Sequence, residues 1–320
     1  MILNSQTRPA AYSVTVIGLG NIGQLYDLHL PKDEFVHTHA RAFSMHPSFN
    51  LVSGIDPSPS LREIFEGNYT AKAYTNLKAM AGALAPEIFI VCSPTETHLP
   101  VIQEIIENYE PLAIVCEKPL AYHHDDALKI VELCQSRGIQ LFVNYPRRAD
   151  PGVVTVKKLL ESNEIKKPLK ALVWYSKGLI HSGTHFIDML NFWLGNVVAA
   201  TPISEPTRIS DVDVDIDLRI EFEDGVAYFL VSTNQDLPHF SVELINENSR
   251  LRYENSGSIT LEDRSTGTST SISTSNPKYQ LKVADQLLLS LSGKGSTLCT
   301  GEMGATYIGL LSPFVPSDIS

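Results

Sequence analysis

A short glycine-rich segment near the start of the chain constrains its fold most strongly. Residues 18–23 read GLGNIG and directly follow Ser13–Ile17, a strand-like run. In this GxGxxG pattern, Gly18 permits a tight turn, Gly20 leaves room for a phosphate, and Gly23 lets a helix pack closely. A strand before the pattern and a helix after it form the context in which it binds the pyrophosphate of a dinucleotide. The segment therefore predicts a dinucleotide-binding domain.

Strand and helix patterns alternate through the first half of the chain. Short apolar runs are separated by amphipathic stretches, which is typical of a parallel sheet covered on both faces. We therefore predict a doubly wound Rossmann domain over residues 1–145. The predicted strands are Ser13–Ile17, Leu51–Ile55, Glu87–Cys92, Leu112–Cys116 and Ile139–Asn144, with helices at Thr97–Asn108 and Asp125–Arg137.

The second half has a different pattern, and we predict a second α+β domain over residues 146–320. Strand-like runs divided by turn signals indicate a mostly antiparallel sheet, and Asp224-Gly225 is a good hairpin turn. The Ser- and Thr-rich segment Asn255–Asn276 is expected to be an exposed hairpin or a flexible loop without chemistry. The predicted helices are Pro151–Ser162 and Ser182–Leu194, and the strands are Lys170–Tyr175, Val212–Phe222, Val226–Ser232, Phe240–Ile245 and Leu251–Tyr253.

Asp56 ends the second predicted strand and is the candidate for binding the ribose hydroxyls. Its carboxylate would repel a 2′-phosphate, and no basic residue follows it immediately, so we predict NAD over NADP. It lies farther from the glycine motif than the usual spacing of about 20 residues. We interpret residues 27–49 as an insertion whose histidines belong to a solvated loop, and we predict no metal site.

Composition limits the possible partners and compartment. With 25 basic and 36 acidic residues, the formal charge is −11, which disfavours binding to nucleic acid. No apolar run approaches the roughly 18 residues of a membrane span, and the N-terminus lacks the apolar core of a signal peptide. Four cysteines without CxxC spacing are expected to be reduced core thiols. These features predict a cytoplasmic protein.

Three polar segments are candidates for the catalytic cleft. SPTETH at 93–98 and Glu117-Lys118-Pro119 each follow a predicted strand, and ligands of open α/β sheets bind beyond the carboxyl ends of strands. The third segment, HSGTHFID at 181–188, opens a helix in the second half, with Ser182 as a plausible N-cap. Asn144, Arg147 and Arg148 lie at the junction of the two halves, where an arginine could pair with a carboxylate or phosphate of a substrate.

The ordered set GLGNIG, SPTETH, CEKPL and a later HxxD resembles the Gfo/Idh/MocA oxidoreductases, which include glucose-fructose oxidoreductase and inositol dehydrogenase. The resemblance implies that Lys118 and His185 are the catalytic pair. The cofactor-binding residues that we expect are Gly18, Gly20, Asn21, Ile22, Gly23, Asp56, Ser93, Pro94, Thr95, His98 and Glu117. The substrate-binding residues that we expect are Lys118, Asn144, Arg147, His181 and Asp188.

One position departs from the family pattern. Many members carry aspartate four residues before the catalytic histidine, where this chain has His181. An imidazole contacts a substrate differently, so a simple transfer of polyol specificity does not follow. Asp188, one helical turn after His185, either orients that histidine or pairs elsewhere.

The resemblance implies an NAD-dependent oxidoreductase that acts on a sugar, a polyol or a sugar derivative such as a nucleotide sugar, and that assembles as a homodimer or homotetramer. Two alternatives stay open at this point. One is a regulatory protein that binds the dinucleotide without turnover. The other is a glycosidase that uses tightly held NAD.

Overall fold

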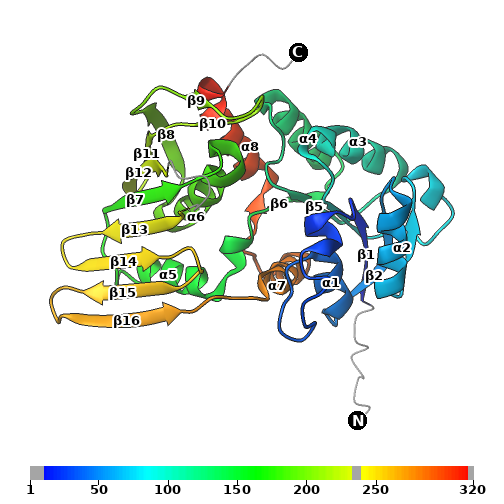
Figure 1. Cartoon of the computed structure of the whole chain (residues 1–320), viewed down its shortest axis with the longest axis horizontal. Helices are drawn as coiled ribbons and strands as arrows, with labels where there is room; N and C mark the ends of the chain where they lie inside the picture. The colour runs from blue at the N-terminus through cyan, green and yellow to red at the C-terminus, as the bar shows by residue number, and fades with distance from the viewer. Residues whose placement is uncertain (1–10, 233–238, 316–320) are drawn as a thin grey trace, which may run out of the picture.

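The computed structural model describes residues 11–232 and 239–315, and it contains two sheets that lie side by side (Figure 1). The expectation that the N-terminus lacks a signal peptide concerns mainly residues 1–10, which lie outside this range. Within the described residues, no helix is long and apolar enough to cross a membrane.

The first sheet has the strand order β17-β6-β5-β4-β1-β2-β3, and all its pairs are parallel except β17 with β6. The order reverses between β1 and β4, so the carboxyl ends of these strands form the edge at which doubly wound sheets bind ligands. This confirms the predicted Rossmann fold. The strands are β1 Tyr12–Ile17, β2 Phe49–Ile55, β3 Lys72–Tyr74, β4 Ile88–Val91, β5 Ala113–Glu117, β6 Gln140–Asn144 and β17 Cys299–Thr300.

Helices cover both faces of this sheet, which explains why its strands are almost wholly apolar. Ile102 of α3 and Ile130 of α4 pack in one apolar cluster, and Phe43 of α1, Phe65 of α2 and Leu287 of α7 pack in the other. The helices of this layer are α1 His39–Met45, α2 Pro59–Asn68, α3 His98–Asn108, α4 His124–Ser136 and α7 Tyr279–Leu291.

The second sheet has the order β16-β15-β14-β13-β7-β12-β11-β8, and every pair is antiparallel except β7 with β12. In β7, buried and more exposed residues alternate, as expected for a sheet with one covered face. The strands are β7 Leu169–Tyr175, β8 Val197–Pro202, β11 Leu218–Phe222, β12 Gly225–Val231, β13 Ser241–Ile245, β14 Ser249–Tyr253, β15 Ile259–Asp263 and β16 Thr268–Ser273.

The remaining helices belong to the second half of the chain. The side chain of Asp150 caps α5, where it accepts hydrogen bonds from the N–H groups of Gly152 and Val153. Trp193 of α6 donates its indole N–H to the carbonyl of Val153 in α5 at 2.9 Å, so these two helices are held together. The bounds are α5 Pro151–Glu161, α6 Thr184–Leu194 and α8 Gly301–Leu311.

Short elements complete the described chain. The π-helices are η1 Asn21–Leu25 and η5 Leu179–Gly183, and the 3-10 helices are η2 Lys78–Met80, η3 Thr95–Thr97, η4 Pro146–Ala149 and η6 Ser312–Phe314. A separate two-stranded ladder joins β9 Thr207–Arg208 and β10 Val214–Asp215.

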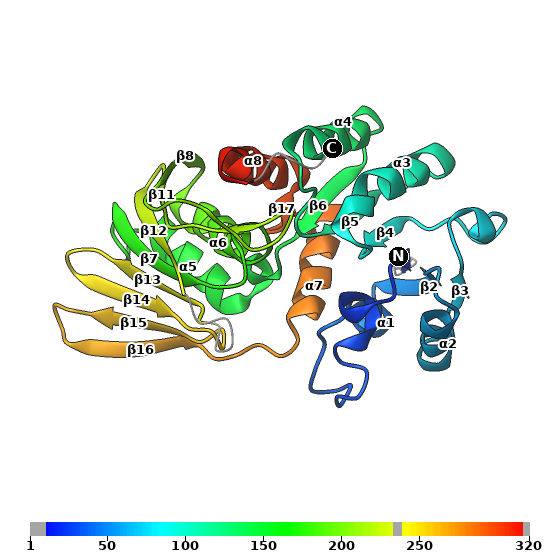
Figure 2. The ribbon, with the colours of Figure 1, turned by 45° about the horizontal axis from the view of Figure 1, so that its top comes forward.

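Several elements differ from the sequence-based expectations. The predicted strand Val212–Phe222 is divided into β10 and β11, because the backbone of Ile216 between them bonds to the hydroxyl of Tyr175 instead of a strand. The Ser- and Thr-rich segment is a hairpin of β15 and β16. Helix α7 and strand β17 return to pack on the first sheet, as Figure 2 shows. The linear boundary at 145/146 therefore stays a proposal.

The segment 27–49 is not a solvated loop. The carboxylate of Asp27 accepts hydrogen bonds from the backbone of His37 and Thr38, and it lies 3.4 Å from the guanidinium of Arg41. Asp27 and Arg41 are both buried, so this ion pair organises the segment around α1. His39 and His46 are also buried, which corrects the prediction of solvated histidines.

Candidate active site at the sheet edge

The glycine turn has the geometry expected of a pyrophosphate cradle. Gly18 has φ +88°, and a Cβ there would lie 2.6 Å from the backbone of Cys92. A Cβ on Gly23 would lie 2.1 Å from the carbonyl oxygen of Gly18, whereas a Cβ on Gly20 meets no protein atom within 4 Å. The first and third glycines are thus required by packing, and the second faces open space. This arrangement fits the diphosphate of a dinucleotide.

The helix that follows the turn is short. It is the five-residue π-helix η1, and the N–H of Leu25 donates to the carbonyl of Gly20 at 3.2 Å. Gln24 is buried and its amide donates to the carbonyls of Leu19 and Leu61. These bonds fix the turn against α2. Asn21 and Ile22 lie within η1, and Ile22 lines the neighbouring cavity.

Asp56 lies at the end of β2, beside the glycine turn. Its carboxylate accepts hydrogen bonds from the N–H groups of Leu19 at 2.9 Å and Ser58 at 2.8 Å. A carboxylate has about four acceptor positions, so it can also accept bonds from ribose hydroxyls. Arg62 donates to the backbone carbonyls of Asp56 and Pro57, which places a cation nearby that the sequence analysis did not consider.

The SPTETH segment forms the turn after β4. The backbone nitrogen of Ser93 lies next to the position that a Cβ on Gly18 would occupy, so this turn adjoins the glycine motif. His98 is buried, and its ring nitrogens lie 3.0 Å from the carbonyl of Ser93 and 3.1 Å from that of Leu120. It therefore links two loops beside the glycine motif, and its contact with the cofactor stays a prediction. Pro94 and Thr95 adjoin this turn, and their contact with the cofactor stays a prediction.

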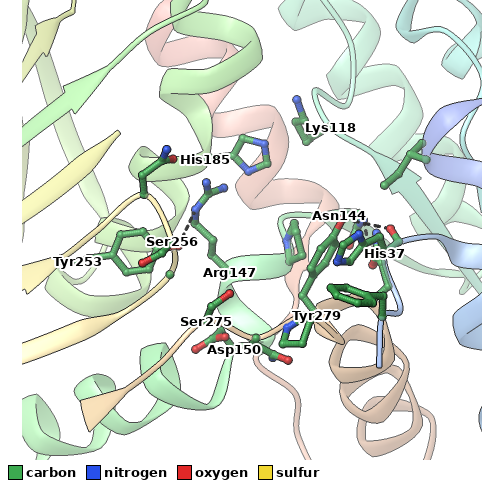
Figure 3. A pocket seen from close by; sticks show the side chains of 18 of the residues that line it. His37, Lys118, Asn144, Arg147, Asp150, His185, Tyr253, Ser256, Ser275 and Tyr279 are labelled. Carbon is green, nitrogen blue, oxygen red and sulfur yellow. Dashed lines mark hydrogen bonds between the residues drawn. The ribbon is translucent and has the colours of Figure 1, made fainter. Parts of the chain in front are cut away.

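A cavity of about 530 Å³ lies between the two sheets. Figure 3 shows side chains converging on it from both halves of the chain. Its lining includes Ile22, Phe35, His37, Glu117, Lys118 and Asn144 from the first 145 residues, and Pro146, Arg147, Asp150, His185, Tyr253, Asn255, Ser256, Gly257, Ser275, Asn276, Pro277, Tyr279 and Gln280 from the rest. The predicted catalytic pair therefore shares one cavity, although its members are far apart in sequence.

Lys118 follows β5 and is held toward the second half of the chain. Its Nζ donates to the carbonyl oxygen of His181 at 2.8 Å. Burial lowers the pKa of Lys118 below its ordinary value; the charge of Glu117 raises it, and that of Arg147 lowers it further. A lysine with a lowered pKa holds its proton less tightly, so it can exchange a proton with a substrate hydroxyl.

His185 lies in the first turn of α6. Its ring packs edge-on against Tyr145 at a centroid distance of 5.5 Å, and its buried Nδ1 has no hydrogen-bond partner among the described residues. Burial lowers the pKa of His185 well below its ordinary value, and the charges of Lys118 and Arg147 lower it further. The imidazole is therefore neutral near pH 7 and can accept a proton.

Glu117 and Asn144 belong to a polar network beside Lys118. The carboxylate of Glu117 lies 2.7 Å from Nε2 of His39 and accepts a hydrogen bond from the amide of Asn144 at 2.6 Å. Burial raises the pKa of Glu117, but the hydrogen bonds from His39 and Asn144 and the charge of Lys118 lower it below its ordinary value overall. Glu117 is thus a fixed anion. The sequence analysis placed His39 in solvent and missed this network.

His181 is held by a buried carboxylate. Asp213 accepts hydrogen bonds from the backbone N–H groups of Ile180 and His181, and its Oδ2 lies 2.7 Å from Nδ1 of the His181 ring. The sequence analysis assigned no role to Asp213. Because His181 is the partner of Lys118, we place Asp213 among the residues that position the lysine.

Asp188 takes the second of the two roles left open for it, and Ser182 does not have the capping role predicted for it. Asp188 is fully buried, and its Oδ1 lies 2.7 Å from Nε of Arg148 and 3.2 Å from the hydroxyl of Tyr307. Asp188 pairs elsewhere and is not positioned to contact a substrate. Ser182 belongs to η5, and the N-cap of α6 is Gly183, without a side-chain capping bond.

Residues that the sequence analysis did not single out form much of the cavity wall. The ring of His37 stacks on Tyr279 with centroids 5.2 Å apart, and Gln280 donates toward His39. The Ser- and Thr-rich segment also reaches the cavity, which no sequence pattern indicated. No local pattern marks these residues, because only the return of α7 to the first sheet brings them here. Within the described residues, no group of three or more His, Cys, Asp or Glu could hold a metal ion.

Comparison with known proteins supports the interpretation of the first sheet and its glycine turn as a dinucleotide-binding domain. Residues 12–145 match the family model GFO_IDH_MocA, described as an oxidoreductase family with an NAD-binding Rossmann fold. Inositol 2-dehydrogenase of Rhizobium meliloti is 26% identical over 194 residues, which are 56% of this chain and 54% of that protein. The enzyme of the same name from Rubrobacter xylanophilus is 28% identical over 53% of this chain and 46% of its own length. These matches span about half the length of the curated relatives.

Solved structures extend the likeness over the whole fold. A putative NADPH-dependent oxidoreductase from Desulfitobacterium hafniense has a TM-score of 0.80 at 17% identity, covering 95% of this chain and 94% of its own. The WlbA dehydrogenase of Bordetella pertussis, solved with NADH and UDP-GlcNAcA, has a TM-score of 0.73 at 16% identity, covering 96% and 95%.

The fold therefore combines a Rossmann domain, which matches an NAD-binding oxidoreductase family model, with a second domain built on a mostly antiparallel sheet. Residues 12–145 match the GFO_IDH_MocA family model, and the rest of the chain shares the fold of the solved oxidoreductase structures.

Proposed function

We propose that this protein is an NAD-dependent dehydrogenase that transfers a hydride between nicotinamide and a hydroxyl or keto carbon of a sugar, a polyol or a sugar derivative, including nucleotide sugars. The observation that carries the proposal is the convergence of Lys118 and His185 on one cavity beside an open glycine cradle. The relatives called inositol 2-dehydrogenase support a polyol-type substrate. No specific observation favours either alternative, the regulatory protein that binds the dinucleotide without turnover or the glycosidase that uses tightly held NAD.

The residues present fit the cofactor. Gly18, Gly20 and Gly23 would hold the pyrophosphate, and Asp56 would bind the adenosine ribose. When bound, the nicotinamide supplies hydride acceptance and donation. The carboxylate of Asp56 supports NAD over NADP, and a comparison of Michaelis constants for the two cofactors tests this preference.

Lys118 and His185 would manage the proton of the substrate hydroxyl. The amine of Lys118 and the half-buried imidazole of His185 line the same cavity, so a hydroxyl bound there would be within reach of both groups. In the oxidative direction, the neutral form of one of these groups accepts the proton, and in the reductive direction the charged form returns it. Burial by both halves of the chain lowers the pKa of both groups, which favours the neutral forms that can accept a proton.

The experiment that tests the proposal is a screen of sugars, polyols and nucleotide sugars for NADH formation at 340 nm, repeated with Lys118→Ala. We expect turnover with at least one substrate and a loss of at least 100-fold in kcat for the variant, within the roughly 10²–10⁴-fold range of general acid–base catalysis. Turnover of Lys118→Ala within a few-fold of the wild type would show that the catalytic assignment is wrong.

We further propose a cytoplasmic homodimer or homotetramer. All four cysteines are unpaired, which supports a reducing compartment. Val198, Ile203 and Tyr228 are exposed apolar residues on or beside the β8–β11–β12 end of the second sheet, and they could be covered by another copy. Light scattering at micromolar concentration tests the assembly, and a monomer there would contradict it.

A further inference from the structure

Arg147 brings a positive charge into the cavity without an acidic partner. Its Nε donates to the hydroxyl of Tyr253 at 3.2 Å, and its guanidinium lies 4.9 Å from the ring centre of Phe186. Among the described residues, no carboxylate oxygen lies within 4.0 Å of its nitrogens. Asp150 also lines the cavity, but its Oδ1 accepts the N–H groups that begin α5. The terminal nitrogens of Arg147 are therefore available to a ligand.

A second cation lies in the same cavity. Lys118 donates only to a backbone carbonyl, and the neighbouring Glu117 is bound to His39 and Asn144. In the view of Figure 3, the ring of His185 lies between the side chains of Arg147 and Lys118. The positive charge of Arg147 acts on both neighbouring groups: it lowers the pKa of Lys118 and the pKa of His185. Two cations therefore face a cavity whose carboxylates, Glu117 and Asp150, are already engaged by other groups, in a protein whose formal charge is −11.

Neutral donors surround Arg147 on the side of the second sheet. Ser256 follows β14, and Ser275 and Asn276 follow β16, and all three line the cavity. The Oδ1 of Asn276 accepts the N–H of Lys278 at 3.0 Å, whereas its buried Nδ2 has no partner in the described structure. A buried donor without a partner costs about 1–3 kcal/mol, so this amide indicates a missing acceptor.

We propose that the substrate carries an anionic oxygen group, a carboxylate or a phosphate, which binds Arg147 and the amide of Asn276. An arginine guanidinium with two free nitrogens matches the paired oxygens of such groups. The proposal rests on the proposed dehydrogenase function and narrows its substrate class to sugar acids or sugar phosphates, in preference to neutral polyols. The anionic group lies at the end of the cavity formed by the second half, away from the glycine cradle.

The test uses matched acidic and neutral probes. Binding of D-glucuronate, glucose 6-phosphate and D-glucose to the NAD-loaded full-length protein is measured by isothermal titration. The variants are Arg147→Gln and Asn276→Asp, with Arg137→Gln as control, because Arg137 is exposed at the end of α4. Hydrogen bonds to charged groups contribute about 1.5–3 kcal/mol, so losing the arginine should weaken acidic ligands roughly 10- to 100-fold.

The expected result is tighter binding of at least one acidic probe than of glucose, lost in Arg147→Gln and retained in Arg137→Gln. Asn276→Asp keeps the side-chain volume nearly unchanged but adds a negative charge. It should therefore weaken binding of the acidic probe and leave the affinity for glucose within about twofold. A response to glucuronate alone identifies a carboxylate as the bound group, and a response to glucose 6-phosphate alone identifies a phosphate.

The proposal is overturned if neither acid binds more tightly than glucose, or if Arg147→Gln weakens acidic and neutral probes equally. The proposed dehydrogenase function fails separately, if the wild type does not bind NAD or reduces none with any substrate. Turnover of neutral polyols without any preference for acids would retain the function and reject the anion site.

Discussion

Substitutions in the glycine motif should separate cofactor binding from folding. In Gly20→Ala, the added methyl group meets no protein atom within 4 Å, and φ at this residue is −76°, outside the left-handed region that favours glycine. The fold should therefore tolerate the change. The methyl group would instead occupy the space of the pyrophosphate. We expect a dissociation constant for NAD at least tenfold higher, which corresponds to about 1.4 kcal/mol.

Gly23→Ala should act on the fold itself. Its methyl carbon would lie 2.1 Å from the carbonyl oxygen of Gly18, whereas close C···O contacts measure about 3.3 Å. The turn and η1 must then separate by roughly 1 Å. Overpacking of this kind costs about 1–3 kcal/mol. At about 2–4 °C per kcal/mol for a large domain, the melting temperature should fall by roughly 3–10 °C, and NAD binding should weaken as well.

Circular dichroism melts and isothermal titration with NAD measure both effects, and Gly67→Ala serves as the control. Gly67 is an exposed residue of α2, and a Cβ there also meets nothing within 4 Å. This variant should melt at or above the wild-type temperature and bind NAD normally. Normal NAD affinity in Gly20→Ala would refute the cradle, and an unchanged melting temperature in Gly23→Ala would refute the packing argument.

Three further predictions follow from the site. First, because burial lowers the pKa of Lys118, kcat/KM for substrate oxidation should rise with pH and level off below pH 10.4, the usual value for lysine; a rise that continues past this pH in a pH–rate profile would contradict it. Second, Asp213→Asn should reduce kcat more than it changes KM and should shift the pH–rate profile, because Asp213 holds His181, whose carbonyl accepts the hydrogen bond from Lys118. A variant that loses only stability would count against a positioning role. Third, Arg148→Met leaves Asp188 buried without its ion pair and should cost about 3–5 kcal/mol of unfolding free energy in a urea titration; a loss below 1 kcal/mol would contradict it.

The parts of the fold that were predicted correctly depend on local patterns. The glycine motif, the apolar strands and the Asp224-Gly225 turn each have a signal within a few residues, and each formed the expected element. Lys118 was placed by its position after a strand, which fixes it at the carboxyl edge of the sheet. These signals need no knowledge of tertiary contacts.

The parts that were missed depend on long-range contacts. His39 is buried because α7 and the segment around Asp27 and Arg41 enclose it, and nothing near it in the sequence indicates this. Asp213 and Asn276 reach the site from loop positions 28 and 91 residues after His185. A polar residue in a Ser- and Thr-rich hairpin is indistinguishable from a solvated one until the sheet positions it. Sequence patterns therefore predicted the cofactor side of the cleft better than the substrate side.

The most direct test of the account is a crystal structure of the protein with NAD and a bound acidic sugar. The account predicts the nicotinamide ring in the cavity between the two sheets, with a substrate hydroxyl within about 3.2 Å of the Nζ of Lys118 and within hydrogen-bond reach of His185. A nicotinamide ring outside this cavity, or a substrate that contacts neither side chain, would contradict it.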